Sequence, residues 1–229
     1  MLIHADFSQI AIVKPENYQW VKSPNGEVER VMLDRIGAET ARATSLVSYA
    51  PQIIFPEHEH PFGEEILVLS GIFSEHGNDY PAGWYLRNPH GSRHIPSSGK
   101  DGALIFVKLR QMMEQETQAL RVNTSDPNSW QQTQQRLICP LFNSENEKVY
   151  MEKLEAQQAF SELSPGGIEI LIAQGELIND QQIYPSGSWI RLPPQTHWNF
   201  HAGKAGATLY VKTNHLLVVL ATHVTTQQS

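Results

Sequence analysis

The chain repeats much of its own sequence at a constant offset of 104 residues, as from Gly71 to Gly175. The repeat has no gaps, and it preserves glycines and prolines that chance would rarely align. Two copies of one structural unit are therefore expected. The repeated positions are Glu65-Ile66-Leu67 with Glu169-Ile170-Leu171, Gly71 with Gly175, Tyr80-Pro81 with Tyr184-Pro185, Gly83 with Gly187, Arg87 with Arg191, Pro89 with Pro193, Gly102-Ala103 with Gly206-Ala207, and Val107-Lys108 with Val211-Lys212.

Both copies contain short apolar runs that favour strands. Runs such as ILVLSGIF and IEILIAQGELI are rich in β-branched residues and are bounded by glycine, proline or asparagine. Many short strands with such turns predict an all-β sandwich or barrel. Helices are expected only at 111–119 and 129–136, the latter after a Ser-Asp-Pro start signal.

Four residues of the first copy have the spacing of a metal site. His58 and His60 are two positions apart, so on a strand both imidazoles lie on one face. Glu64 shares their parity and begins an apolar run, in which Glu65 is expected to face outward. His94 follows a turn-rich segment that returns the chain to the same place. Nitrogen and carboxylate ligands suit a divalent ion, with Zn first and Fe, Mn or Ni open.

A His-x-His pair alone is more often a solvated loop feature than a ligand pair. The glycines and proline at 83, 89 and 91, which lead to His94, favour the four-ligand interpretation. They also complete a known pattern. The residues His58, His60, Glu64 and Gly71, and then Gly83, Pro89, Gly91 and His94, resemble the two motifs of the cupin superfamily, with departures at Gln52 and Ser98.

Around these motifs, about residues 18–110 resemble more narrowly the cupin-like domain of the anti-sigma factor ChrR, in which zinc-binding modules respond to oxidative stress. The resemblance implies two tandem jelly-roll cupin barrels. We expect an N-terminal arm at 1–17, a metal-binding cupin domain at 18–112, a linker at 113–140 and a second cupin domain at 141–229. The sigma-binding module of that family needs a Cys-x-x-Cys pair, and the only cysteine here is Cys139. Sigma-factor binding is therefore not expected to carry over.

The second copy lacks the proposed ligands. The offset maps His58 to Glu162, His60 to Ser164, Glu64 to Ile168 and His94 to Trp198. Glu162 without its partners cannot hold a transition metal tightly, even if His197, which precedes Trp198, is counted as a second ligand. We predict that the second unit binds no metal.

Composition narrows the location and the partners. A formal net charge of −7 with scattered Lys and Arg disfavours nucleic-acid binding. The absence of a long apolar run or a signal-peptide pattern predicts a cytoplasmic protein without a membrane span. Cys139, beside a proline between apolar stretches, is expected to be a buried structural thiol rather than a redox sensor. Homodimerisation stays open.

Three functions are compatible with this sequence. The first is a metal-binding sensor or regulatory module of the ChrR type. The second is an Fe(II)-dependent dioxygenase that acts on a small diketone-like substrate. The third is a purely structural role, in which the ion only stabilises the barrel. A closed tetrahedral site would favour the brace, whereas open positions beside a cavity would favour the enzyme. Candidate substrate contacts are Arg93, Phe62, Trp84 and Tyr85, while Arg87 is expected to be structural because it recurs as Arg191.

Overall fold

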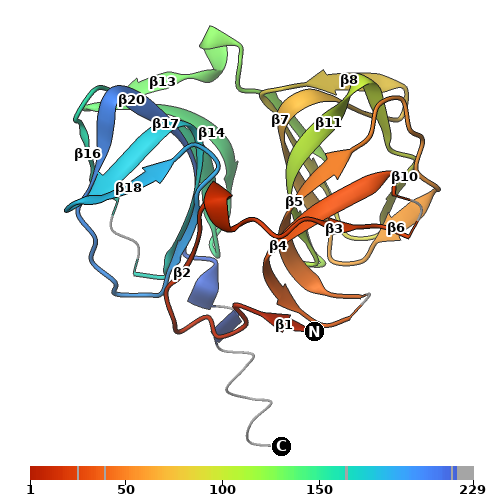
Figure 1. Cartoon of the computed structure of the whole chain (residues 1–229), viewed down its shortest axis with the longest axis horizontal. Coiled ribbons are helices and arrows are strands. Elements are labelled where there is room, and N and C mark those ends of the chain that lie inside the picture. Colours follow the sequence, from red (N-terminus) through yellow and green to blue (C-terminus); the bar gives the residue numbers. More distant parts are fainter. Residues whose placement is uncertain (25, 39, 163–164, 218, 221–229) are drawn as a thin grey trace, which may run out of the picture. The chain divides into compact units, whose positions relative to one another are not determined.

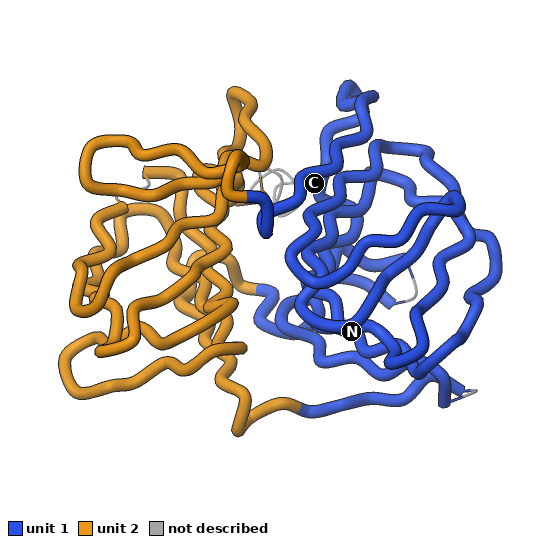
Figure 2. Tube along the Cα trace, turned by 90° about the horizontal axis from the view of Figure 1, so that it is seen from above, with its two compact units in different colours: residues 1–5, 19–126 blue, residues 6–18, 127–229 orange. Residues whose placement is uncertain are grey.

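A computed structural model of the chain describes residues 1–24, 26–38, 40–162, 165–217 and 219–220. The described residues divide into two compact units, residues 1–5 with 19–126 and residues 6–18 with 127–229 (Figure 2). Nearly all regular structure is β-strand (Figure 1), which confirms the all-β expectation.

Unit 1 contains a nine-stranded sheet and a separate two-stranded ribbon. The main sheet has the order β1-β4-β5-β11-β7-β9-β12, with β3 on β4 and β8 on β7, and the ribbon pairs β6 with β10. The sheet does not close on itself within the described part of the unit. Its strands are β1 (Leu2–Ile3), β3 (Val21–Lys22), β4 (Val28–Ile36), β5 (Arg42–Tyr49), β6 (His58–His60), β7 (Glu64–Glu75), β8 (Asn78–Pro81), β9 (Trp84–Asn88), β10 (Ser92–His94), β11 (Ser97–Leu109) and β12 (Leu120–Asn123).

Unit 2 contains a second nine-stranded sheet of similar order. The order is β13-β14-β15-β20-β17-β19-β2, with β16 on β20 and β18 on β17. Two short 3-10 helices, η1 (Pro15–Asn17) and η2 (Pro127–Ser129), accompany these strands. The strands are β2 (Ala11–Val13), β13 (Gln131–Thr133), β14 (Arg136–Asn143), β15 (Lys148–Leu154), β16 (Ala159–Phe160), β17 (Ile168–Asn179), β18 (Gln182–Pro185), β19 (Trp189–Leu192) and β20 (Phe200–Thr213).

The strands repeat at the offset that the sequence shows. β7 and β17 begin at 64 and 168, and β8 and β18 begin at 78 and 182, so both pairs lie 104 residues apart. The backbone around Gly71 and Gly175 explains why both copies of the repeat have glycine at this position. Each has a positive φ, and an added Cβ would lie 2.1 Å from the carbonyl oxygen of Gly102 or Gly206 respectively. A side chain at either position would collide with the neighbouring strand.

The edge strand beside β9 in unit 1 and the edge strand beside β19 in unit 2 occupy equivalent positions. They come from different parts of the sequence. In unit 1, β12 pairs with β9, and Arg121 lies opposite Leu86. In unit 2, β2 pairs with β19, and Ile12 lies opposite Ile190. The N-terminal arm expected at 1–17 therefore supplies β1 to unit 1 and β2 to unit 2, and the linker expected at 113–140 contains β12, β13 and the start of β14.

Both predicted helices are wrong. At 111–119, the Met112 amide donates to the Phe62 carbonyl, and the Glu116 carboxylate accepts hydrogen bonds from Arg87, so tertiary contacts hold this segment irregular. At 129–136, Gln134 has a φ of 54° and forms the turn of a hairpin between β13 and β14. Tertiary pairing overrides a weak local preference for helix in both places.

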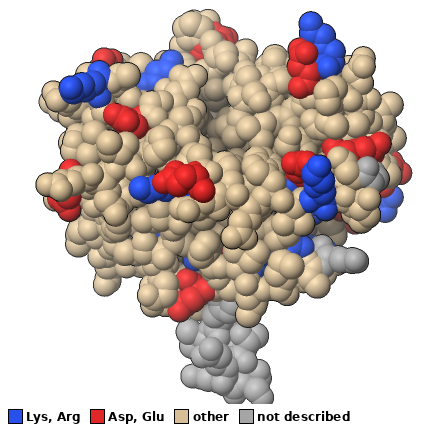
Figure 3. Space-filling model, viewed as in Figure 1, with Lys and Arg blue, Asp and Glu red and all other residues tan. Residues whose placement is uncertain are grey.

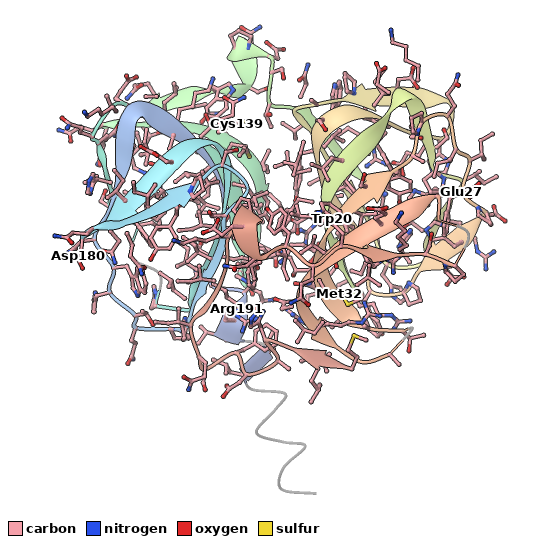
Figure 4. The ribbon with its side chains drawn as sticks, viewed as in Figure 1. Trp20, Glu27, Met32, Cys139, Asp180 and Arg191 are labelled. Carbon is pink, nitrogen blue, oxygen red and sulfur yellow. The ribbon has the colours of Figure 1, made fainter. Side chains whose placement is uncertain are left out.

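Cys139 is fully buried on β14 and forms no disulfide, and Figure 4 labels it. Burial raises the pKa of its thiol to about 11. The expectation of a buried thiol is confirmed.

Candidate metal centre

The β6–β10 ribbon places two histidines directly opposite each other. Its register pairs His94 with His58, Arg93 with Glu59 and Ser92 with His60. Directly opposed residues share a face of the ribbon, and the next pair along the strands points the other way. His58, His60 and His94 therefore converge on one side, whereas Arg93 points to the other side and pairs with Glu59 at 2.6 Å.

The fourth predicted ligand lies on the main sheet. Glu64 begins β7 and is 5% exposed. It lies opposite Asn88 on β9, whose amide Nδ2 donates to Glu64 Oε2 at 3.2 Å. This bond fixes the carboxylate so that its Oε2 faces the histidines.

The ligand atoms of all four residues meet. His94 Nε2 lies 2.8 Å from His60 Nε2 and 3.3 Å from His58 Nε2. Glu64 Oε2 lies 3.5 Å from His60 Nε2 and 3.6 Å from His94 Nε2. A tetrahedral ion with bonds of about 2.0–2.1 Å holds its ligand atoms roughly 3.3 Å apart. The structure therefore brings together the four residues that the sequence proposed.

Backbone and carboxylate partners determine which nitrogens face inward. His58 Nδ1 lies 2.9 Å from the Pro56 carbonyl, which can only accept, so this nitrogen carries the proton. His94 Nδ1 contacts the carboxylate of Glu75 in the same way. In the neutral rings, both Nε2 lone pairs then point into the centre. Lone pairs that face one another at these distances are stabilised by a cation, so the donor set fits a divalent metal ion.

Glu75 is a site residue that the sequence did not reveal. It lies at the end of β7, is 1% exposed, and forms a second cluster of potential ligands with Glu64 and His94. Its Oε1 contacts the guanidinium of Arg121 on β12. Asn88 links these groups, since its Nδ2 donates to Glu75 Oε2 at 3.1 Å and its Oδ1 accepts from Arg121 at 2.6 Å.

A change of strand parity explains why Glu75 was missed. Residues of even number face the interior at the start of β7, as Ile66 and Val68 do. The register with β11 shifts on both sides of Gly71, and beyond it Phe73 belongs to the same interior cluster. The odd-numbered Glu75 therefore faces the ligands. A repeated glycine inside a strand is the signal that could have indicated this irregularity.

Burial and neighbouring charges control protonation in the cluster. Burial, with the charge of His94, lowers the pKa of His60 to about 4, and burial also lowers the pKa of His58. Burial would lower the pKa of His94 too, but the hydrogen bond and charge of Glu75 raise it. At neutral pH, His58 and His60 are therefore neutral, which is the form that binds metals.

A cavity of about 270 Å³ opens beside the cluster within unit 1. Three of the four ligands line it, namely His58, His60 and Glu64. The opposite walls are the inner faces of β4, β5 and β11. The other charged or aromatic residues that line the cavity are Arg30, Arg35, Tyr49, Phe55, Glu59 and Arg110.

The four substrate contacts proposed from the sequence lie elsewhere. Arg93 has a side chain that is 61% exposed, and Phe62 packs near the ring of His90. Trp84 packs against Tyr80, and Tyr85 is fully buried in the sheet. None of the four is among the residues that line the cavity.

Strands β7 and β9 share a buried ion pair on the face away from the ligands. Arg87 is 1% exposed and pairs with Glu65 at 3.1 Å and with Glu116 at 2.6 Å, which confirms its structural role. Glu65 lies on the face away from the ligands, as expected, but it is 3% exposed rather than solvated. Its ion pair with Arg87 satisfies the buried charge.

The equivalent positions of unit 2 carry other contacts. Glu162 accepts a hydrogen bond from Tyr150 and pairs with Arg136, each at 2.8 Å. Trp198 stacks on Phe200 at a centroid distance of 5.2 Å. Ile168, at the position of Glu64, belongs to the hydrophobic core. Ser164, at the position of His60, lies outside the described residues.

One protein family resembles the first half of the chain. Residues 8–113 match the family model of the ChrR cupin-like domain. This part of the chain is similar to that domain. No curated protein sequence matches this chain.

Solved structures show a similar fold over most of this chain's length. A candidate dioxygenase from Nostoc punctiforme has 15% identity and a TM-score of 0.69, covering 89% of this chain and 82% of its own. A bacterial pirin from Escherichia coli, in complex with nickel(II), has 12% identity and a TM-score of 0.66, covering 90% and 98%. A cupin barrel protein from Leptotrichia buccalis has 14% identity and a TM-score of 0.57, covering 85% and 92%.

The surface charge and the helices of the described residues bear on binding partners and on membrane insertion. On the face shown in Figure 3, Lys and Arg side chains are interspersed with Asp and Glu side chains. Within the described residues, no helix has the length and apolar character needed to cross a bilayer. The cytoplasmic location and the lack of nucleic-acid binding stay predictions.

Proposed function

We propose that this protein is a metal-dependent dioxygenase that acts on a small chelating, diketone-like substrate. The observation that carries the proposal is the cavity of about 270 Å³ that reaches His58, His60 and Glu64. An ion used only as a brace would need no such space beside its ligands. The volume lies just below the range of drug-sized ligand pockets, which suits a small substrate.

Four residues of unit 1 would hold the ion: His58, His60, Glu64 and His94. Zn is the first expectation for such a donor set, but oxygen chemistry requires a redox-active ion such as Fe(II). When bound, that ion would supply Lewis acidity toward substrate oxygens and reactivity toward dioxygen. Glu75, Asn88 and Arg121 would orient the ligands through the hydrogen bonds described above.

The cavity wall offers a proton donor for the substrate. Tyr49 lines the cavity, and burial with the nearby charge of Glu64 raises the pKa of its phenol. Tyr49 therefore stays protonated and can donate a hydrogen bond to a substrate oxygen. Phe55 packs edge-on against the His58 ring at 5.3 Å and limits access of water to that side.

The test has two steps. Metal analysis of protein purified without added metal first identifies the ion that the cluster retains. Oxygen uptake is then measured with a panel of β-dicarbonyl compounds on the Fe(II)-loaded protein, with His60→Ala as the inactive control. Uptake that requires His60 supports the enzyme, and no uptake across the panel overturns it.

The match of residues 8–113 to the ChrR cupin-like domain favours a second candidate, a metal-binding sensor or regulatory module without the sigma-binding zinc domain. Hydrogen exchange of the Zn-loaded protein, before and after treatment with singlet oxygen or peroxide, tests this role. A sensor should change its exchange pattern around β6 and β10, while a protein without this role should keep it.

We further infer that unit 2 is a second cupin copy, which makes the chain a bicupin. The equal offsets of β7 with β17 and of β8 with β18 support this, as does a solved cupin barrel protein that covers 85% of this chain. Its site positions, filled by Trp198 and Ile168, support the loss of metal binding in that copy.

A further inference from the structure

We propose that the cavity of unit 1 selects a substrate that carries a carboxylate in addition to its chelating oxygens, bound by Arg30, Arg35 and Arg110. This inference rests on the proposed function and specifies its substrate class. A neutral diketone would need only the metal and a hydrogen-bond donor such as Tyr49. Three arginines among the residues that line one cavity require a different explanation.

The three arginines come from two places in the main sheet of unit 1. Arg30 and Arg35 lie on β4, and Arg110 directly follows β11. The register of β4 with β5 shifts between Met32 and Asp34. This irregularity turns Arg35 to the same side as Arg30, although the two have opposite parity. Both then line the cavity that contains the metal ligands.

Their positive charges are not neutralised within the described residues. Arg35 donates to the Ala38 carbonyl, and Arg110 lies 6.0 Å from the Phe62 ring. Neither contact involves a carboxylate, and Arg30 has no ion pair among the salt bridges of the described chain. Glu59 also lines the cavity, but it pairs with the exposed Arg93 at 2.6 Å.

Two of the three arginines, Arg30 and Arg35, also repel each other. Burial, with the charge of Arg30, lowers the pKa of Arg35, so these two guanidinium groups sense each other in the cavity. Such an arrangement costs free energy in the free protein, and an anion relieves it. The rest of the chain is acidic, with a net charge of −7, so the cavity is a local exception. A guanidinium binds a carboxylate through a bidentate fork.

The positions of the arginines and the metal ligands around the cavity would also orient the substrate. The chelating oxygens would face His58, His60 and Glu64, while the carboxylate would face β4 and the end of β11. A β-diketone with an adjacent carboxylate, such as 2,4-dioxopentanoate, has both groups in one small molecule. Acetylacetone has the same diketone without the carboxylate, and the two compounds form a matched pair.

Calorimetric titration of the Fe(II)-loaded protein under nitrogen tests the proposal. We expect 2,4-dioxopentanoate to bind about tenfold tighter than acetylacetone or more, as one charged hydrogen-bond pair contributes. Arg30→Gln and Arg110→Gln should each remove most of this preference, and Arg30→Lys should keep part of it. Lys22→Gln is the control, because this exposed lysine pairs with Glu29 on the surface and neither residue lines the cavity, and it should keep the full preference.

Melting temperatures of each variant establish that it is folded before it is titrated. Equal binding of the two compounds by the wild type, or a preference that survives both glutamine variants, overturns the proposal, as does failure of both compounds to bind. Binding and oxygen uptake distinguish failure of this inference from failure of the proposed dioxygenase function. Tight, arginine-dependent binding without oxygen uptake would preserve the carboxylate site and remove the dioxygenase, whereas uptake without any preference would do the reverse.

Discussion

The two units place different chemistry on the same strands. In unit 1, His94 and Glu64 meet two other ligands beside a cavity. At the matching positions of unit 2, Trp198 packs on an aromatic ring and Ile168 joins the core. The two glycines that allow close strand approach, Gly71 and Gly175, have φ values of 71° and 74°.

This difference separates what the fold needs from what the site needs. Buried ion-pairing positions are kept in both units, as Arg87 lies opposite Glu65 and Arg191 lies opposite Glu169. The ligand positions are not kept. A buried cluster of imidazoles is costly to a fold unless a bound ion compensates it, whereas Trp and Ile at these positions contribute hydrophobic burial directly.

The largest expected effect comes from removing a ligand. His60→Ala and His94→Ala should each abolish metal retention, because the remaining donors leave the ion incompletely coordinated. Metal content is measured by mass spectrometry after gel filtration. His58→Ala should act in the same direction.

Substitutions in unit 2 provide the control for ligand removal. Glu162→Ala should lower stability, since it leaves Arg136 without one ion-pair partner, but it should leave metal content unchanged. His197→Ala should also leave metal content unchanged. Equal loss of metal from these variants and from His94→Ala would contradict a single site in unit 1.

The shared scaffold can be broken in both units in the same way. Gly71→Ala and Gly175→Ala should each destabilise the protein by about 3 kcal/mol or more, because the new Cβ would lie 2.1 Å from a backbone oxygen. Only Gly71→Ala should also weaken metal binding, since it moves Glu75. Thermal melting with and without added metal measures both effects.

Gly77→Ala separates the steric effect from the backbone effect. Gly77 has a φ of 74°, but nothing lies within 4 Å of an added Cβ. Its cost should therefore be only about 1–2 kcal/mol from the left-handed conformation. If Gly77→Ala and Gly71→Ala were equally destabilising, the close strand approach would not be the reason for the repeated glycines.

A smaller effect is expected from the groups that orient the ligands. Glu75→Gln removes the negative charge that faces His94 Nδ1 and should weaken metal binding by about 10–100-fold without abolishing it. Competition with a chromophoric chelator measures the affinity. Glu29→Gln removes a carboxylate that pairs on the surface with Lys22, and it should leave the affinity unchanged. An unchanged affinity in Glu75→Gln would exclude Glu75 from the site.

Local patterns predicted the four ligands because each depends on short spacing. His58 and His60 share a strand, and His94 follows the glycine-marked turn that leads into the paired strand β10. The repeat likewise predicted the equal spacing of β7 and β17. These features need only strand parity and glycine-marked turns.

The features that were missed depend on irregular or distant contacts. Glu75 reaches the site only because the register of β7 shifts around Gly71, and Arg35 reaches the cavity through a similar shift on β4. Arg121 arrives on an edge strand from the region expected to be a linker. No spacing rule within one segment can predict side chains that meet through sheet order.

The smallest expected effect uses Cys139, the only cysteine, as a probe of unit 2. Burial raises the pKa of its thiol to about 11, from 9.0, so the reactive thiolate is about a hundredfold rarer than for an ordinary thiol at pH 8. Labelling by a thiol reagent should be slow in the folded protein, and its rate should keep rising as the pH approaches 11 instead of levelling near 9. Stoichiometric Zn should not change this rate, because the proposed ligands all lie in unit 1. Protection by Zn would reveal a metal site in unit 2, and rapid labelling at pH 8 would show that β14 opens readily there.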